Sequence, residues 1–300
     1  VGGVVTLSST VNGVNGGNDD HLDIISGSGT VTISGLIGGT QALTTLDINA
    51  TAGQTANITI GSIGTGGTAG VSGITTLGNT NTGTLTTGNT LLFGGGFTYG
   101  GDYDKTTQTF DTNGGNANFL GDVTVNGDFS VTTDGGNITI SGNVSGTNAT
   151  DTFTLTDGTG ASDSGTITIG GTIGAGDNIK TVSLTGDSGV SLAGNIKTSN
   201  SAGGNVTITG PITLTGNVTI DADAANTTVT LNSTATVNSD STARDFEIDT
   251  NGGKVSVDSV LGGLTALNSI KINSDTTGTA EIDIAGIGAT NAGVVEGGAT

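Results

Sequence analysis

Four aspartates beside glycine-rich corners are the residues of this chain best suited to metal chemistry. Asp19, Asp20 and Asp23 lie in GGNDDHLD (residues 16–23), and Asp177 lies in GAGDNI (174–179). Carboxylate and carbonyl oxygens at such corners are hard ligands of the kind that Ca²⁺ prefers. Each stretch matches only a fragment of the G-G-x-G-x-D calcium repeat, and neither is repeated in tandem. We therefore interpret them as solvated corner residues; no cofactor is required, and calcium is the one that the sequence suggests.

Catalytic chemistry has few candidate residues. His21 is the only histidine and the chain has no cysteine, which excludes a thiol nucleophile and a histidine-rich metal site. A serine triad would depend on His21, and no G-x-S-x-G motif is present. We expect His21 to be a solvated loop residue and the protein not to be an enzyme.

Paired carboxylates could serve a polysaccharide lyase or a glycosidase, which remains a remote alternative. Aspartate is plentiful, but no local grouping of Asp with Arg or Lys stands out. The single arginine, Arg244, lies in STARDFEID.

The aromatic residues are concentrated in one part of the chain. They could form an exposed platform for sugar rings or an internal ladder that fills the widest coils. Because Phe outnumbers Tyr and Trp is absent, we expect the internal ladder. Six of the nine fall within 27 residues: Phe93, Phe97, Tyr99, Tyr103, Phe110 and Phe119.

Composition indicates an ordered, all-β chain with a thin core. Among 300 residues there are 57 Gly and one Pro, 32% are hydrophobic and only 3% aromatic, and the mean hydropathy of +0.07 is too high for a disordered tract. The formal charge of −20 repels phosphate backbones and anionic lipid. No run approaches the roughly 18 apolar residues of a spanning helix. Nucleic acid and membrane insertion are therefore not expected.

The stretch NVTITGPITLTGNVTID (205–221) repeats with a period of six. Apolar residues alternate with Thr, as in half-buried strands. Gly210 and Gly216 end two of the six-residue units. Asn205 and Asn217 begin two of these units, and Asn tolerates the left-handed region. Corners this short bend the chain without reversing it, so the pattern favours a coil of three sides.

The expected fold is a right-handed parallel β-helix with roughly triangular coils, and the alternative is a tandem β-sandwich array. Turns of about 19 residues rising about 4.8 Å each would make a rod of about 75 Å. In 205–221, one set of side chains should point outward: Thr207, Thr213 and Thr219. The set that should point inward comprises Val206, Ile208, Ile212, Leu214, Val218 and Ile220.

The chain also repeats at larger scale. Residues 33–73 align without a gap on 257–297, at an offset of 224, and a weaker copy begins at about residue 169. Such repetition is typical of solenoids, in which each unit buries its face against its neighbours. We interpret 1–300 as one continuous β-solenoid segment. Because the chain starts and ends inside the pattern and has no Met, we expect it to be part of a longer repeat array.

The module I-G-G-x-x-A-L-x-x-L-x-I-N at 37–49 recurs at 261–273 with Leu in its first position and Ile in its tenth. It occurs with FTYGGD (97–102) and TFDTNGGNANFLGDV (109–123). Together these motifs resemble the repetitive stalks of filamentous-haemagglutinin-like adhesins and related giant bacterial surface proteins. The resemblance implies an extracellular or cell-surface rod that holds binding modules away from the cell. Its expected partners are neighbouring repeats or further copies, end to end, and glycans or host surfaces. The alternative role is a self-assembling filament, sheath or surface-layer subunit.

The T-x-T spacing of Thr152, Thr154 and Thr156 raises ice binding as another remote alternative. Ice binding would require regular ranks of Thr at one fixed coil period. The spacing of the strand repeats along this chain varies, which counts against ice binding.

Overall fold

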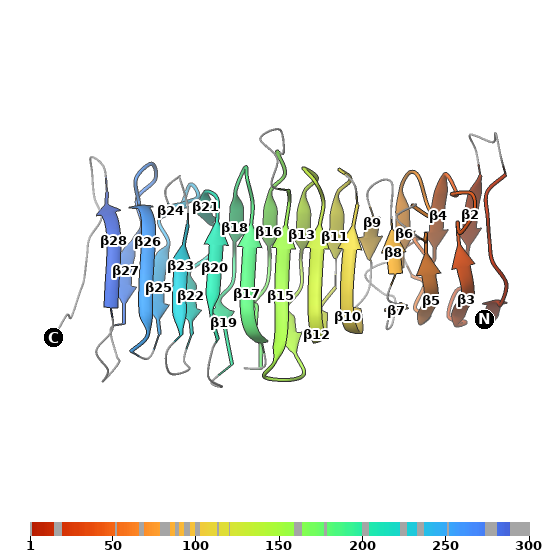
Figure 1. Cartoon of the computed structure of the whole chain (residues 1–300), viewed down its shortest axis with the longest axis horizontal. Helices are drawn as coiled ribbons and strands as arrows, with labels where there is room; N and C mark the ends of the chain where they lie inside the picture. The colour runs from red at the N-terminus through yellow and green to blue at the C-terminus, as the bar shows by residue number, and fades with distance from the viewer. Residues whose placement is uncertain are drawn as a thin grey trace.

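The chain folds into a parallel β-solenoid that advances along one axis from the N-terminal to the C-terminal end (Figure 1). The computed structural model describes residues 2–14, 20–51, 53–65, 69–78, 85–87, 90–92, 97–99, 103–112, 114–119, 121–158, 164–176, 179–199, 204–222, 227–232, 237–250, 252–273 and 281–288. Within these ranges β-strands are the only regular secondary structure, and no membrane-spanning helix is found there. Strands pair in parallel with those one coil away, which confirms the β-helix and excludes the hairpin-linked sandwich array.

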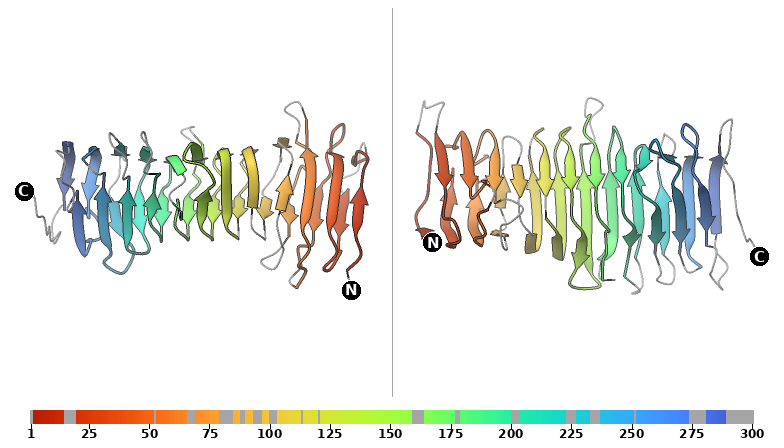
Figure 2. Two further views of the ribbon diagram at one scale, coloured as in Figure 1. Left: turned by 90° about the horizontal axis from the view of Figure 1, so that it is seen from below. Right: turned by 180° about the vertical axis from the view of Figure 1, so that it is seen from behind.

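Three ladders of strands form the three sides of the coil (Figure 2). Ladder 1 contains β1 (Val5–Leu7), β7 (Leu85–Thr87), β14 (Val144–Gly146), β19 (Ile196–Lys197), β22 (Val218–Asp221), β25 (Asp245–Asp249) and β27 (Ser269–Ile272). Ladder 2 contains β8 (Thr90–Leu92), β15 (Asp151–Thr156), β17 (Ile179–Thr185), β20 (Val206–Thr209) and β23 (Thr228–Leu231). Ladder 3 contains β2 (His21–Ile24), β4 (Thr45–Ile48), β6 (Thr75–Leu77), β9 (Phe97–Tyr99), β11 (Ala117–Phe119), β13 (Ile138–Ile140), β16 (Ile167–Ile169), β18 (Val190–Leu192), β21 (Ile212–Leu214) and β24 (Val237–Ser239).

Six longer strands run over a corner and belong to two ladders. Four of them connect ladder 1 to ladder 2: β3 (Val31–Ile37), β5 (Ile58–Ile63), β10 (Tyr103–Asp111) and β12 (Val123–Thr132). Two connect ladder 2 to ladder 3: β26 (Lys254–Leu261) and β28 (Glu281–Ile287). Their pairings shift register at the corner, as a β-bulge does when it bends a strand.

The three repeat units of 205–221 together make one complete coil. Its three segments are β20 on ladder 2, β21 on ladder 3 and β22 on ladder 1. Each inward side chain is at most 2% exposed, whereas Thr207, Thr213 and Thr219 face outward. The predicted inward and outward sets are therefore confirmed.

The predicted coil of about 19 residues is too short. Hydrogen bonds between adjacent coils join residues 21 apart, from the Asn143 N–H to the Asp122 Oδ1 atom, and 29 apart, from the Thr172 N–H to the Asn143 Oδ1 atom. The extra residues lie between the strands, so coils of different length still stack in register. At roughly 25 residues a coil, the chain makes a rod of about 58 Å rather than about 75 Å.

Glycine and asparagine act differently at the corners. Gly210 has φ +104°, and a Cβ there would lie 1.8 Å from the Gly186 carbonyl oxygen, so both conformation and space require glycine. Asn205 and Asn217 are not left-handed, contrary to the prediction. Instead, their Oδ1 atoms accept hydrogen bonds from the N–H groups of Thr228 and Asp245, one coil further along.

The interior is a narrow column of Val, Ile and Leu with an aromatic stack near its middle. Phe110 and Phe119 are buried, with ring centroids 5.3 Å apart, which confirms the internal ladder for these two residues. The Phe129 ring contacts both of these rings, and the Phe153 ring stacks on that of Phe129 with a centroid distance of 5.4 Å. The other four predicted members, at positions 93, 97, 99 and 103, lie outside the side chains that the structure describes.

Candidate functional site

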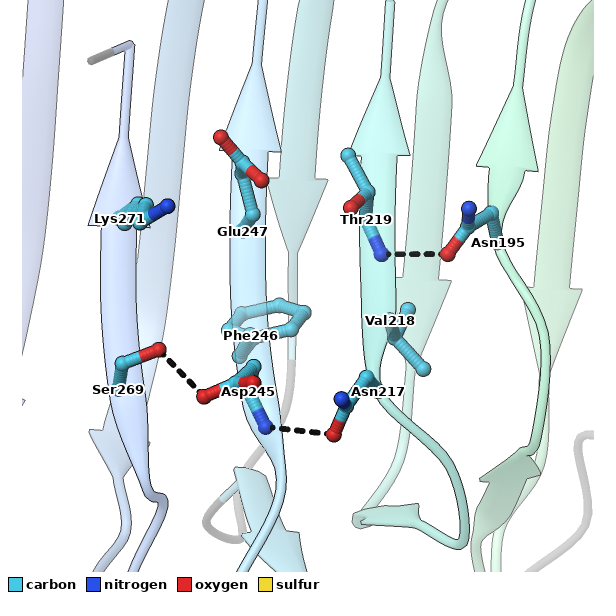
Figure 3. Close-up of a pocket in the computed structure, with 9 residues that line it drawn as sticks. All are labelled: Asn195, Asn217, Val218, Thr219, Asp245, Phe246, Glu247, Ser269 and Lys271. Carbon is cyan, nitrogen blue, oxygen red and sulfur yellow. Dashed lines mark hydrogen bonds between the residues drawn. The ribbon is translucent and has the colours of Figure 1, made fainter.

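A shallow groove of ≈ 350 Å³ lies on the outer surface of ladder 1, across β22, β25 and β27 and beside β19 (Figure 3). Most outward positions elsewhere on the rod hold Thr or Ser, whereas this surface carries amides, carboxylates and an amine. The groove is lined by Asn195, Asn217, Val218, Thr219, Asp245, Phe246, Glu247, Ser269 and Lys271.

Two asparagines are fixed at the groove by the backbone of the next coil. The Oδ1 atom of Asn195 accepts from the Thr219 N–H at 2.9 Å, and that of Asn217 accepts from the Asp245 N–H at 3.1 Å. Both residues are exposed. Because each oxygen is held, each side-chain NH₂ group points its donors away from that bond, toward solvent and the groove.

Asp245 is held by the next coil as well. Its Oδ1 atom accepts from the Ser269 hydroxyl at 2.6 Å and from the Asn268 amide at 2.7 Å. These hydrogen bonds, with a smaller contribution from the positive charge of Lys271, lower the pKa of Asp245 below its ordinary value. This carboxylate is therefore charged at neutral pH.

Glu247 and Lys271 complete the charged part of the groove. Strand register aligns Thr219, Glu247 and Lys271 on consecutive coils, so the three side chains form one rank (Figure 3). Asp245 and Glu247 are two residues apart on β25 and project from the same face. A general acid needs a raised pKa near the working pH, whereas that of Asp245 is lowered. Asp245 is therefore not suited to act as a general acid.

Two of the four predicted calcium ligands, Asp20 and Asp23, lie among the residues that the structure describes. Asp19 and Asp177 lie outside the described residues. Asp20 accepts from the Val14 N–H at 2.8 Å, while Asp23 is exposed on β2 in register with Asp47. Among the residues that the structure places, no three His, Cys, Asp or Glu form a group that could hold a metal.

His21 is exposed, as expected, but it begins β2 rather than lying in a loop. Its ring Nδ1 hydrogen-bonds the Thr45 hydroxyl on the next coil. The register of β2 against β4 places these two residues side by side. The only histidine of the chain thus joins two coils on the outer surface.

Sequence reasoning did not find Asp245, Glu247 and Lys271, although it noted STARDFEID. The available signal was the alternation in DFEID, where Phe246 and Ile248 point inward and the acids outward. A coil of about 19 residues would have placed Ala266, not Lys271, beside Glu247. Only the observed register brings the amine to the acids.

Comparisons with family models, with curated proteins and with solved structures find no match to this chain.

Proposed function

We propose that this chain is a rod-like segment of an extracellular bacterial surface protein, whose work is to supply length and stiffness in an adhesin stalk. The observation that carries this proposal is the unbroken stacking of coils from β1 to β28 around one apolar column. Each coil is stabilised mainly by its two neighbours, so adding coils adds length without a new core. A self-assembling filament or surface-layer subunit would use the same rod.

The C-terminal coil supports end-to-end partners. Ile282 is 47% exposed and Ile287 is 38% exposed on β28, where the equivalent side chains of inner coils are buried. In the described structure β28 pairs with β26 alone. An apolar, half-paired edge of this kind accepts a further coil, from the same chain or from a second copy.

Surface display tests the spacer role. One, two or three copies of the chain would be placed between an outer-membrane anchor and a gold-labelled reporter domain, and the reporter height measured by electron microscopy. We expect about 58 Å of added height per copy. Heights that do not increase with copy number would contradict the proposal. Micrographs of native cells, showing isolated stalks or uniform filaments, separate the two versions.

Ice binding is a second candidate, favoured by the outer surface of ladder 2. Register places hydroxyl side chains directly above one another in consecutive coils: Ser130, Thr154, Ser183, Thr207 and Thr230. Thr132, Thr156, Thr185 and Thr209 form a parallel rank. The objection from variable coil length no longer applies, because the ranks stay in register. Measurable thermal hysteresis that is lost in Thr207→Lys would favour this candidate, and none at millimolar protein would reject it.

A further inference from the structure

The groove on ladder 1 offers hydrogen-bond donors and acceptors side by side. The donors are the NH₂ groups of Asn195 and Asn217 and the Lys271 ammonium. The acceptors are the carboxylates of Asp245 and Glu247. A ligand that satisfies both kinds must itself carry donors and acceptors in close succession, as the hydroxyl groups of a sugar do.

Charge and surface character disfavour other ligand classes. An anionic ligand would meet two carboxylates and a chain of formal charge −20. A small cation would meet the Lys271 ammonium. An apolar ligand finds no exposed apolar side chain, because Val218 is 2% exposed and Phe246 is 1% exposed. A neutral, hydroxyl-rich ligand remains.

The direction of the groove suits a linear chain of sugars. The groove crosses successive strands of ladder 1, so its polar groups recur once per coil, at intervals of about 4.8 Å. A pyranose ring joined through 1,4 bonds is about as long as one coil step. The register that sets Thr219, Glu247 and Lys271 in one rank would offer successive rings a hydroxyl, a carboxylate and an ammonium group, one on each coil.

We propose that this groove binds a neutral, 1,4-linked oligosaccharide, laid along the solenoid axis with about one sugar ring over each coil. The site goes beyond the rod function, because a spacer needs no groove. Its failure would leave the rod proposal intact. The donors Asn195 and Lys271 lie at opposite ends of the groove, and the acceptor Glu247 lies between them (Figure 3).

Calorimetric titration of the whole chain with cellohexaose and chitohexaose tests the site, with oligogalacturonate as an anionic control. We expect at least one neutral hexamer to bind and the anionic one to bind at least tenfold more weakly. Lys271→Met and Glu247→Gln should each weaken binding about tenfold. Both side chains lie on the outer surface, so these variants should fold, which circular dichroism would check.

Asn195→Asp has a matched control in Asn205→Asp. Each asparagine is exposed and accepts one backbone N–H bond of 2.9 Å from the next coil, but only Asn195 lines the groove. The aspartate keeps the acceptor and removes the NH₂ donor. We expect Asn195→Asp to weaken binding about tenfold and Asn205→Asp to leave it unchanged. No heat from either neutral hexamer at millimolar concentration, or equal affinities for wild type, Lys271→Met and Glu247→Gln, would overturn the proposal.

Discussion

Asn49 and Asn273 have the same conformation and matching hydrogen bonds on two different sides of the rod. Their φ angles are 48° and 49°, and their N–H groups donate at 2.8 Å to the carbonyls of Ile24 and Ile248. Asn49 follows β4 on ladder 3, whereas Asn273 follows β27 on ladder 1. The two copies of the repeat, which are offset by 224 residues, therefore lie on different sides of the coil: the second copy lies on the side that follows the first along the chain. The three sides are near equivalent, which a roughly triangular coil allows.

Asn49→Ala should destabilise the chain by about 3 kcal/mol. The Asn49 Oδ1 atom accepts from the Ser26 N–H at 2.8 Å, and Ala would lose this buried bond and carry the cost of positive φ. Asn49→Gly keeps the conformation and should lose only about 1 to 2 kcal/mol. Urea denaturation measures both. Equal losses would show that the backbone conformation contributes nothing.

Gly210→Ala should destabilise the rod by about 4 kcal/mol or more, because the new Cβ would clash with the Gly186 carbonyl oxygen. Gly53→Ala is the matched control. Its φ is +88°, but nothing lies within 4 Å of the added Cβ, so it should cost only about 1 to 2 kcal/mol. Thermal melts of the two variants compare them. A Gly210 variant as stable as the Gly53 variant would refute the close stacking of these corners.

Asp151→Ala should cost about 3 kcal/mol. Asp151 is 1% exposed, and its carboxylate accepts from three backbone N–H groups, those of Gly127, Thr147 and Asn148, each at 2.8 Å. Asp128→Ala, at an exposed site, should cost about 0.5 kcal/mol or less. Chemical denaturation should separate the two variants clearly, and similar losses would contradict a specific role for the buried carboxylate.

Acid should weaken the groove through Asp245. Its pKa is lowered in the folded chain, so its contribution to stability is present above the unfolded pKa of about 3.9 and is lost as the pH falls through the folded value. Ser269→Ala removes the largest cause, and the pKa should move up toward the ordinary value. Carbon-detected NMR titration of Asp245 follows this directly. An unchanged pKa in Ser269→Ala would contradict the assigned cause.

Much of the fold follows from local pattern. Alternation of Val or Ile with Thr determines which side chains face inward, as Val206, Thr207 and Ile208 show. Register does not follow from local pattern, because the residues between strands vary in number while the stacking stays constant. For that reason the pairing of Glu247 with Lys271 could not be predicted, although each lies on a recognisable strand. The corner asparagines bond to the next coil, so their partners also depend on the register and could not be predicted.

Distances between spin labels along ladder 2 test the stiff rod most directly. The chain has no Cys, so double Cys variants pairing Ser62 with Thr207, Thr230 or Ser256 can be labelled cleanly. Register places these partners six, seven and eight coils from Ser62. Double electron–electron resonance should give narrow distance distributions centred near about 29, 34 and 38 Å. Broad distributions, or distances that do not increase by about 5 Å per coil, would contradict a rigid solenoid.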